Sequence, residues 1–246
     1  MQDYSRENPM DDIILCITEG EKTEILFLKD LIRHFLPNNR LRIIPFCADI
    51  YQLYAQMQSD DFFDLLPLLQ SRNNNQDINQ YTREQIAQIY LFFDYDGHAT
   101  NASDEKITEM LEYFNNETEK GKLYISYPMV EALKDSLQDP SDRILTSPVS
   151  SSDYKELVHG RGPCIFQQLR KTEKSHWCKQ LNLHLKIGHY IVSNQPTLPS
   201  SYEIKKTLTQ SNIFSQQQTK YIKPTQSVAV LSPFAFFLVE YTGKLF

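Results

Sequence analysis

The chain has 246 residues, of which 41% are hydrophobic and 23% charged, a balance that supports one large folded domain or a domain with an appendage and excludes general disorder. No apolar run reaches the roughly 20 residues that span a bilayer, and residues 1–12 are polar and acidic, so we expect a cytoplasmic protein without a membrane segment. The formal net charge of −6 is unusual for a protein that binds nucleic acid, because phosphate contacts come mostly from clustered Lys and Arg.

The first half of the chain alternates short apolar runs with segments of helical periodicity. Strands are predicted over residues 13–17, 41–48, 86–93 and 122–127. Helices are predicted over residues 22–35, 50–58, 62–69 and 104–114, with Asp104 as the N-cap of the last, and residues 71–80 are expected to form a loop. A short helix carrying Glu131 and Lys134 is expected after Pro128. This alternation predicts an α/β domain over residues 12–138, with a parallel-rich sheet flanked by helices.

The second half of the chain has a different character. Residues 139–162 are rich in Ser, Pro and Asp and are predicted to be a boundary loop. Residues 165–193 and 202–220 have helical patterns, and the apolar segment 228–241 closes the chain as a helix or a strand. We therefore expect residues 139–246 to form a mainly helical C-terminal extension.

Several Cys and His residues lie close together in this extension, at positions 164, 176, 178, 184 and 189. Their spacings match no regular zinc site, so ordinary packing or surface positions are predicted for them. The four cysteines of the chain are scattered without a CxxC pair, which favours reduced thiols.

Acidic residues follow two of the predicted strands. Glu19 comes directly after the first strand, and Asp94 and Asp96 come at the end of the third. Open α/β sheets bind ligands at the carboxyl ends of their strands, so these carboxylates converge if the two strands are neighbours. In an extended segment the side chains of Asp94 and Asp96 share one face. Hard oxygen ligands without nearby His or Cys suit Mg²⁺ or Mn²⁺. The alternative is that these are solvated loop residues.

Two motifs resemble those of a known family. The segment ITEGEKTE at residues 17–24 resembles the strand–EGxxxE–helix opening of TOPRIM domains, and is closest to that of OLD- and RloB-like nucleases. The segment FFDYDG at residues 92–97 resembles the DxD strand of the same family. Residues 125–133 resemble its third characteristic stretch, which places Glu131 at a site position; the alternative is an exposed helix glutamate.

The resemblance implies a TOPRIM-like catalytic domain and a metal-dependent endonuclease acting on phosphodiester bonds. Asp94 and Asp96 would bind Mg²⁺ or Mn²⁺, and Glu19 would be a ligand or the general base. Glu24 would reach a second ion, and Glu21 is a weaker candidate for that role.

Two lysines are candidates for contacts with phosphate. Lys134 would neutralise the scissile phosphate, and Lys22 lies near a helix N-terminus that favours phosphate. The alternative is that both lysines are plain surface charges.

The C-terminal part resembles the tails of small TOPRIM proteins encoded beside an ATPase in anti-phage operons such as PARIS. This resemblance implies a toxic defence effector that a partner ATPase holds inactive. The motifs leave DNA and RNA open as substrates, and the resemblance favours RNA such as tRNA. The apolar segment Phe234–Tyr241 is the expected partner surface, unless it caps the core. A homo-oligomer is left open.

Two other functions compete with the nuclease. FFDYDGH at residues 92–98 also resembles the haloacid-dehalogenase phosphatase signature, with Asp94 as the nucleophile and Asp96 as a general acid. Against this, His98 occupies the place of the signature Thr, and no later apolar strand ends in a paired Asp. The third option is a non-catalytic TOPRIM binding subunit, although every acidic position that catalysis needs is present.

Overall fold

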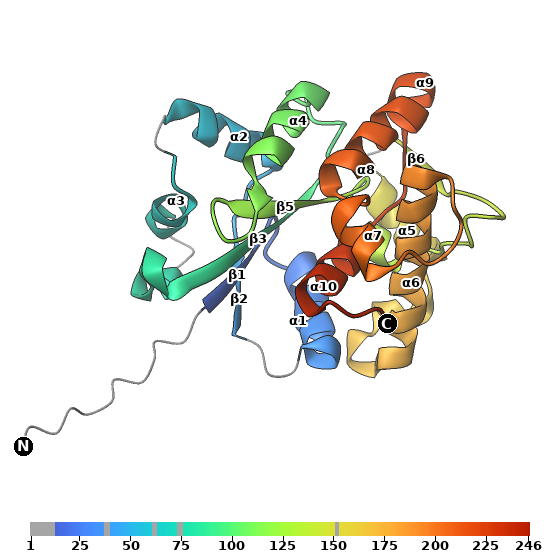
Figure 1. Cartoon of the computed structure of the whole chain (residues 1–246), viewed down its shortest axis with the longest axis horizontal. Helices are drawn as coiled ribbons and strands as arrows, with labels where there is room; N and C mark the ends of the chain where they lie inside the picture. Colours follow the sequence, from blue (N-terminus) through green and yellow to red (C-terminus); the bar gives the residue numbers. More distant parts are fainter. Residues whose placement is uncertain (1–12, 37–39, 61–62, 73–75, 151–152) are drawn as a thin grey trace, which may run out of the picture.

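The computed structural model describes residues 13–36, 40–60, 63–72, 76–150 and 153–246. It confirms an α/β fold, in which a five-stranded, mostly parallel sheet is flanked by helices and is followed by a helical C-terminal region. Figure 1 shows α2, α3 and α4 on one side of the sheet, with α1, α6 and α10 on the other. None of the helices in these ranges combines the length and the apolar character needed to cross a membrane.

The secondary-structure elements have the following bounds. The strands are β1 (Ile13–Thr18), β2 (Leu41–Pro45), β3 (Ile86–Asp94), β4 (Asn115–Asn116), β5 (Gly121–Ser126), β6 (Thr146–Pro148) and β7 (Ser227–Ala229). The α-helices are α1 (Thr23–Phe35), α2 (Ile50–Ser59), α3 (Leu65–Ser71), α4 (Asp104–Tyr113), α5 (Tyr154–Arg161), α6 (Lys174–Ser193), α7 (Ser201–Lys206), α8 (Gln210–Gln217), α9 (Lys223–Thr225) and α10 (Phe234–Thr242). The 3-10 helices are η1 (Gln76–Gln80), η2 (Arg83–Gln85), η3 (Val130–Lys134), η4 (Cys164–Gln167) and η5 (Leu169–Lys171), and η6 (Gln218–Ile222) is a π-helix.

The strand order of the main sheet determines where a ligand can bind. The order is β2-β1-β3-β5-β4, and every neighbouring pair is parallel except β4 with β5. From β1 the chain passes to β2 on one side and then returns to β3 on the other. The order therefore reverses between β1 and β3, and in open parallel sheets the crevice beyond the carboxyl ends at such a reversal is the usual ligand site.

The last helix, α10, covers one face of the sheet. The ring of Phe92 on β3 stacks on Phe234 with the ring centroids 4.9 Å apart, and contacts Phe237 edge-on at 5.1 Å. Residues Phe234–Val239 are all 0% exposed. The expectation that Phe234–Tyr241 forms a partner surface is therefore wrong for most of this segment, because its aromatic side chains complete the core.

The segment 139–162 is not the plain boundary loop that its composition predicts. It contains β6, which pairs antiparallel with β7, and the helix α5. Tyr154 and Val158 on α5 are buried, so an apolar face one turn long fixes this helix to the body of the protein. One apolar core runs from β1 to α10 across residue 138, and the division of the chain at that residue stays a prediction.

Several element boundaries differ from the predicted ones. The N-cap of α4 is Ser103, whose Oγ accepts from the Lys106 amide, and Asp104 is the first helical residue. The segment 228–241 is both a strand and a helix, β7 followed by α10. Within the predicted loop 71–80, the last five residues form η1, and residues 73–75 lie outside the described ranges, as does residue 62 of the third predicted helix.

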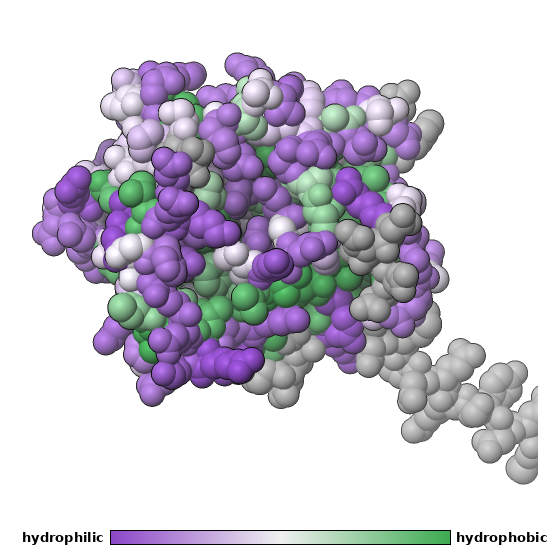
Figure 2. Space-filling model, turned by 180° about the vertical axis from the view of Figure 1, so that it is seen from behind, coloured by the Kyte–Doolittle hydropathy of each residue, from purple (hydrophilic) through white to green (hydrophobic). Residues whose placement is uncertain are grey.

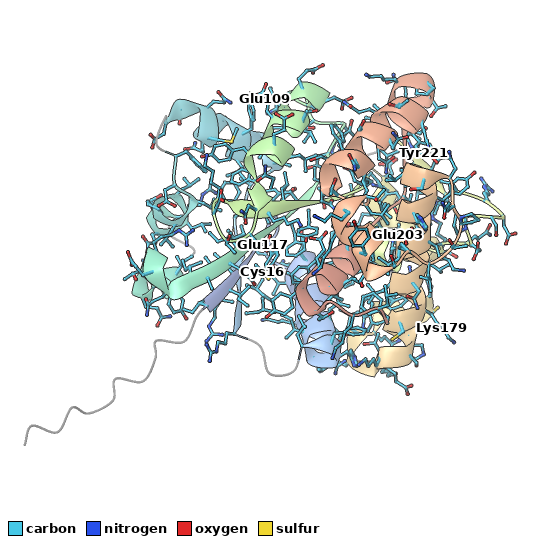
Figure 3. The ribbon with its side chains drawn as sticks, in the orientation of Figure 1. Cys16, Glu109, Glu117, Lys179, Glu203 and Tyr221 are labelled. Atoms are coloured by element: carbon cyan, nitrogen blue, oxygen red, sulfur yellow. The ribbon has the colours of Figure 1, made fainter. Side chains whose placement is uncertain are left out.

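The four cysteines are free thiols. Cys16 lies on β1 inside the molecule, whereas Lys179 projects from the outer side of α6 (Figure 3). His184 on α6 is fully buried, and its Nδ1 accepts a hydrogen bond from the Ser232 amide.

The face in Figure 2 is largely hydrophilic, with a band of hydrophobic residues across its lower half.

The contact between α6 and α10 yields a prediction with a matched control. A Cβ at Gly188 of α6 would lie 2.4 Å from Cζ of the buried Phe236, whereas a Cβ at Gly160 of α5 meets nothing within 4 Å. We expect Gly188→Ala to lower the free energy of unfolding by about 1–3 kcal/mol through overpacking. Gly160→Ala should raise it by about 0.5–1 kcal/mol, because alanine loses less backbone entropy in a helix. Urea melts of both variants measure this, and equal effects would contradict the close packing of α10 on α6.

Candidate functional site

Carboxylates from the ends of four parallel strands line one cavity of about 520 Å³. Glu19 follows β1, Asp49 follows β2, Asp94 ends β3, and Glu131 follows β5. The remaining lining residues come from the β1–α1 connection and the start of α1, from the β2–α2 connection, from the start of η3 and from α5: Gly20, Glu21, Lys22, Thr23, Glu24, Cys47, Ala48, Met129, Val130 and Lys155. We call this space the acidic cavity. It lies at the reversal of strand order between β1 and β3.

Glu19 is held by backbone contacts on both sides. Its amide donates to the Phe92 carbonyl at 3.0 Å, and its carbonyl accepts from the Cys47 amide at 2.9 Å. These bonds extend the sheet one residue past β1 and fix the direction of the Glu19 side chain. Its Oε2 accepts from the Asp94 amide at 3.0 Å. Burial raises the pKa of Glu19 well above its ordinary value, and the charges of Asp96 and Glu24 raise it further.

Asp94 is buried at the end of β3. It is 8% exposed, and its Oδ1 is buried without a hydrogen-bond partner among the residues that the structure describes. Burial raises the pKa of Asp94 well above its ordinary value, and the nearby charges of Glu19 and Glu24 act in the same direction. A buried carboxylate without a partner is costly, and such a group is normally protonated or bound to a cation.

Asp96 is near Glu19 and lies in the turn that follows β3. The strand ends at Asp94, and Asp96 has a left-handed backbone with φ of 44°. The expectation of an extended Asp94–Asp96 segment is therefore wrong, because the turn redirects the second side chain. Asp96 accepts a hydrogen bond from Glu19, and its Oδ1 lies 3.9 Å from Nδ1 of His98. Burial raises the pKa of Asp96, while His98 opposes that rise.

Glu24 reaches the acidic cavity from the first turn of α1. Its Oε1 accepts from the Gly20 amide at 3.1 Å. A Cβ on residue 20 would lie 2.9 Å from Oε2 of Glu24, so glycine lets this carboxylate lie against the backbone. Burial raises the pKa of Glu24, and the charge of Glu131 adds to that effect while Lys155 opposes it.

Glu131 and Lys134 lie on the expected short helix, η3, but they face different spaces. Glu131 is 3% exposed and lines the acidic cavity. Lys134 places its Nζ 5.8 Å from the ring centroid of Phe27 and lines a neighbouring cavity. The predicted action of Lys134 on the scissile phosphate stays a prediction. Lys22 is at the N-cap of α1 and lines the acidic cavity, as expected for a lysine at a helix N-terminus.

Two residues of this cavity are missing from the sequence-based site. Nζ of Lys155 on α5 lies 3.7 Å from Oε1 of Glu131, and Asp49 accepts from the Gln52 amide as the N-cap of α2. The three- and four-residue spacing of Tyr154, Leu157 and Val158 is the sequence signal that could have predicted the helix carrying Lys155. Asp49 comes directly before the helical segment that begins at Ile50, and an Asp in this position indicates a helix N-cap.

The residues present suit a divalent cation in type, although they are not arranged as a finished metal site. Within the described ranges, no group of three His, Cys, Asp or Glu side chains is positioned to hold a metal ion. The donors are nevertheless hard carboxylate oxygens, and Oδ1 of Asp94 has no hydrogen-bond partner in the described part of the chain, which fits Mg²⁺ or Mn²⁺.

We compared the chain with protein-family models, with curated proteins and with solved structures, and none of the three comparisons gave a match. The TOPRIM-like resemblance of the two motifs therefore stays a prediction.

The raised pKa values predict how pH affects the stability of the metal-free chain. The ordinary values are 4.5 for Glu19 and 3.8 for Asp94, and both are raised in the folded state. Between the ordinary and the raised pKa values, these two carboxyl groups bind protons in the folded chain but not in the unfolded chain. The free energy of unfolding therefore falls as the pH rises through this range. We expect Asp94→Asn to raise the melting temperature in EDTA at neutral pH by about 2–4 °C or more.

This gain should shrink as the pH falls through the raised pKa of Asp94, because Asp94 is then protonated in the wild type as well. Glu112→Gln, at an exposed position on α4, is the control and should leave the melting temperature unchanged at each pH. An Asp94→Asn chain less stable than wild type at every pH would contradict the account of a repelled, unpartnered carboxylate.

Proposed function

We propose that this chain is a Mg²⁺- or Mn²⁺-dependent endonuclease that hydrolyses phosphodiester bonds in nucleic acid. The observation that carries the proposal is the buried, unpartnered Oδ1 of Asp94 in a cavity that Glu19, Glu24 and Glu131 also line. Such a group of like charges is stabilised by a divalent cation. The order of the EGxxxE and DxD motifs along the sequence supports the same function.

Asp94 and Asp96 would hold the metal ion, with Glu19 as a further ligand or as the general base. A bound divalent ion supplies charge stabilisation at the phosphate and an acidified water. Glu19 suits proton transfer because burial raises the pKa of its carboxyl group, which makes the carboxylate a stronger base. The Asp94 amide would orient this carboxylate by donating to Oε2.

Lys155 and Lys22 would bind the phosphate that enters the acidic cavity. Lys155 is 68% exposed, and its Nζ lies 3.7 Å from Glu131, so its ammonium can exchange this ion pair for a phosphate oxygen. Lys22, at the N-cap of α1, adds its charge to the partial positive charge of the helix N-terminus. Glu24 and Glu131 would hold a second ion or orient water.

The resemblance to anti-phage effectors supports a more specific form of the proposal, in which the target is RNA such as tRNA and a partner ATPase controls the chain. The net charge of −6 agrees with control by a partner, because a free nuclease of this charge is poorly attracted to a polyanion.

The test replaces the carboxylates of the site one at a time by the corresponding amides. Glu19→Gln and Asp94→Asn should each lower the Mg²⁺-dependent cleavage rate of RNA or DNA by about 10²–10⁴-fold, because each removes a charge needed for proton transfer or metal binding. Glu112→Gln should retain wild-type cleavage. The measurement is single-turnover cleavage of tRNA, other RNA and DNA at low salt, with the chain alone and with the proposed ATPase partner.

Two results would contradict the nuclease. Undiminished Mg²⁺-dependent cleavage by both amide variants would remove Glu19 and Asp94 from the mechanism. Covalent labelling of Asp94 by a phosphate mimic would instead favour the phosphatase alternative, in which this aspartate is a nucleophile.

A further inference from the structure

A second cavity, of about 530 Å³, adjoins the acidic cavity, and the two share Thr23 at the start of α1. Both cavities use the same helix as a wall. Glu24 faces the acidic cavity, whereas Leu26 and Phe27, less than one turn further on, face the second. We call the second space the flanking cavity. The two cavities are neighbouring parts of one surface along α1.

Two more elements divide their side chains between the cavities in the same way. On η3, Glu131 lines the acidic cavity and Lys134 the flanking cavity. On α5, Lys155 lines the acidic cavity and His159, one turn later, the flanking cavity. A ligand that extends out of the acidic cavity along these three elements therefore enters the flanking cavity.

One part of the flanking cavity is apolar and rigid. Phe27 and Phe166 both contact the buried Trp177, with ring centroids 6.2 Å and 4.7 Å away respectively. Leu169 and Leu26 continue this surface, and Leu26 is 57% exposed, which is high for a leucine. A flat apolar group can lie here against fixed side chains, at little cost in side-chain entropy.

The rest of the cavity is basic. Lys134, His159, Arg170 and Lys171 line it, and among the described residues no Asp or Glu does so. In a chain of net charge −6 this is a local excess of positive charge, directly beside a group of carboxylates. An apolar surface beside cations complements a ligand with a flat apolar part and an anionic part, which is the chemistry of a nucleotide.

We infer that the flanking cavity binds a nucleobase of single-stranded nucleic acid, next to the phosphate that enters the acidic cavity. The base contacts Leu26 and Leu169, and the neighbouring phosphates contact Lys171 and Arg170. A base in a duplex is stacked on both faces and cannot enter, so the cavity selects a single strand, a loop or a flipped nucleotide. This inference rests on the proposed nuclease for the position of the scissile phosphate, but the base-binding cavity can be tested without catalysis.

The test measures binding by the full-length Glu19→Gln chain, which should not cleave. The probes are fluorescein-labelled single-stranded RNA and DNA of about ten nucleotides and the corresponding duplexes, at low salt. Leu26→Glu and Lys171→Glu alter the apolar and basic parts at exposed positions. Their matched controls are Leu198→Glu, at a leucine that is 42% exposed, and Lys179→Glu, on the outer side of α6 (Figure 3).

We expect the single strand to bind more tightly than the duplex, and Leu26→Glu and Lys171→Glu each to weaken single-strand binding about tenfold. The controls should stay within about twofold of the parent chain, since a single distant surface charge adds little. Melting curves of all four variants verify that the fold is retained.

The other outcomes show whether the base-binding cavity or the proposed nuclease is wrong. Equal binding of single strand and duplex, or equal loss in the Leu26 and Leu198 variants, would overturn the inference. So would a chain that binds no oligonucleotide but loses its protein partner on Leu26→Glu, because the cavity would then be a protein-docking site. Wild-type cleavage by Leu26→Glu and Lys171→Glu would overturn the base site and leave the nuclease standing. Selective single-strand binding without cleavage in any divalent metal would support the base site and contradict the nuclease.

Discussion

The burial of like-charged carboxylates at the carboxyl ends of parallel strands is the constraint on which the rest of this structure depends. Asp94 and Glu131 are almost wholly buried, and the pKa of Asp94 is raised because burial and its neighbours disfavour the charged form. Stability alone would favour apolar residues at such positions. Under the proposed function, a divalent cation would neutralise these charges.

The surrounding fold holds these groups by the backbone and by buried polar contacts. The sheet hydrogen bonds on both sides of Glu19 fix that residue. Further from the cavity, the fully buried Asp135 accepts from Tyr154 at 2.6 Å and from Nε and Nη2 of Arg161 at 2.8 and 2.7 Å. These bonds tie α5 to the end of η3 and so keep Lys155 beside Glu131. The acidic cavity is thus supported by the segment that follows the sheet as well as by the sheet.

Sequence reasoning found the parts of the site that depend on local pattern. An apolar strand followed by an acidic residue identified Glu19 and Asp94, and the alternating strands and helices gave the α/β fold. The left-handed turn at Asp96 was missed, since nothing in FFDYDG distinguishes it from a continuing strand. Lys155 and the flanking cavity were missed because they depend on the tertiary contact of α5 with η3. The buried ending Phe234–Val239 shows the same limit, because apolar composition suits a core and an interface equally.

The central claim is that the acidic cavity binds a divalent metal ion, and anomalous diffraction from a crystal soaked in Mn²⁺ tests it most directly. The account predicts an anomalous peak within about 2.0–2.3 Å of a carboxylate oxygen of Asp94, at the distance of a direct metal–oxygen bond. The same soak of an Asp94→Asn crystal should show no peak there. A wild-type crystal with Mn²⁺ bound elsewhere, and none beside Asp94 at a saturating concentration, would contradict the account.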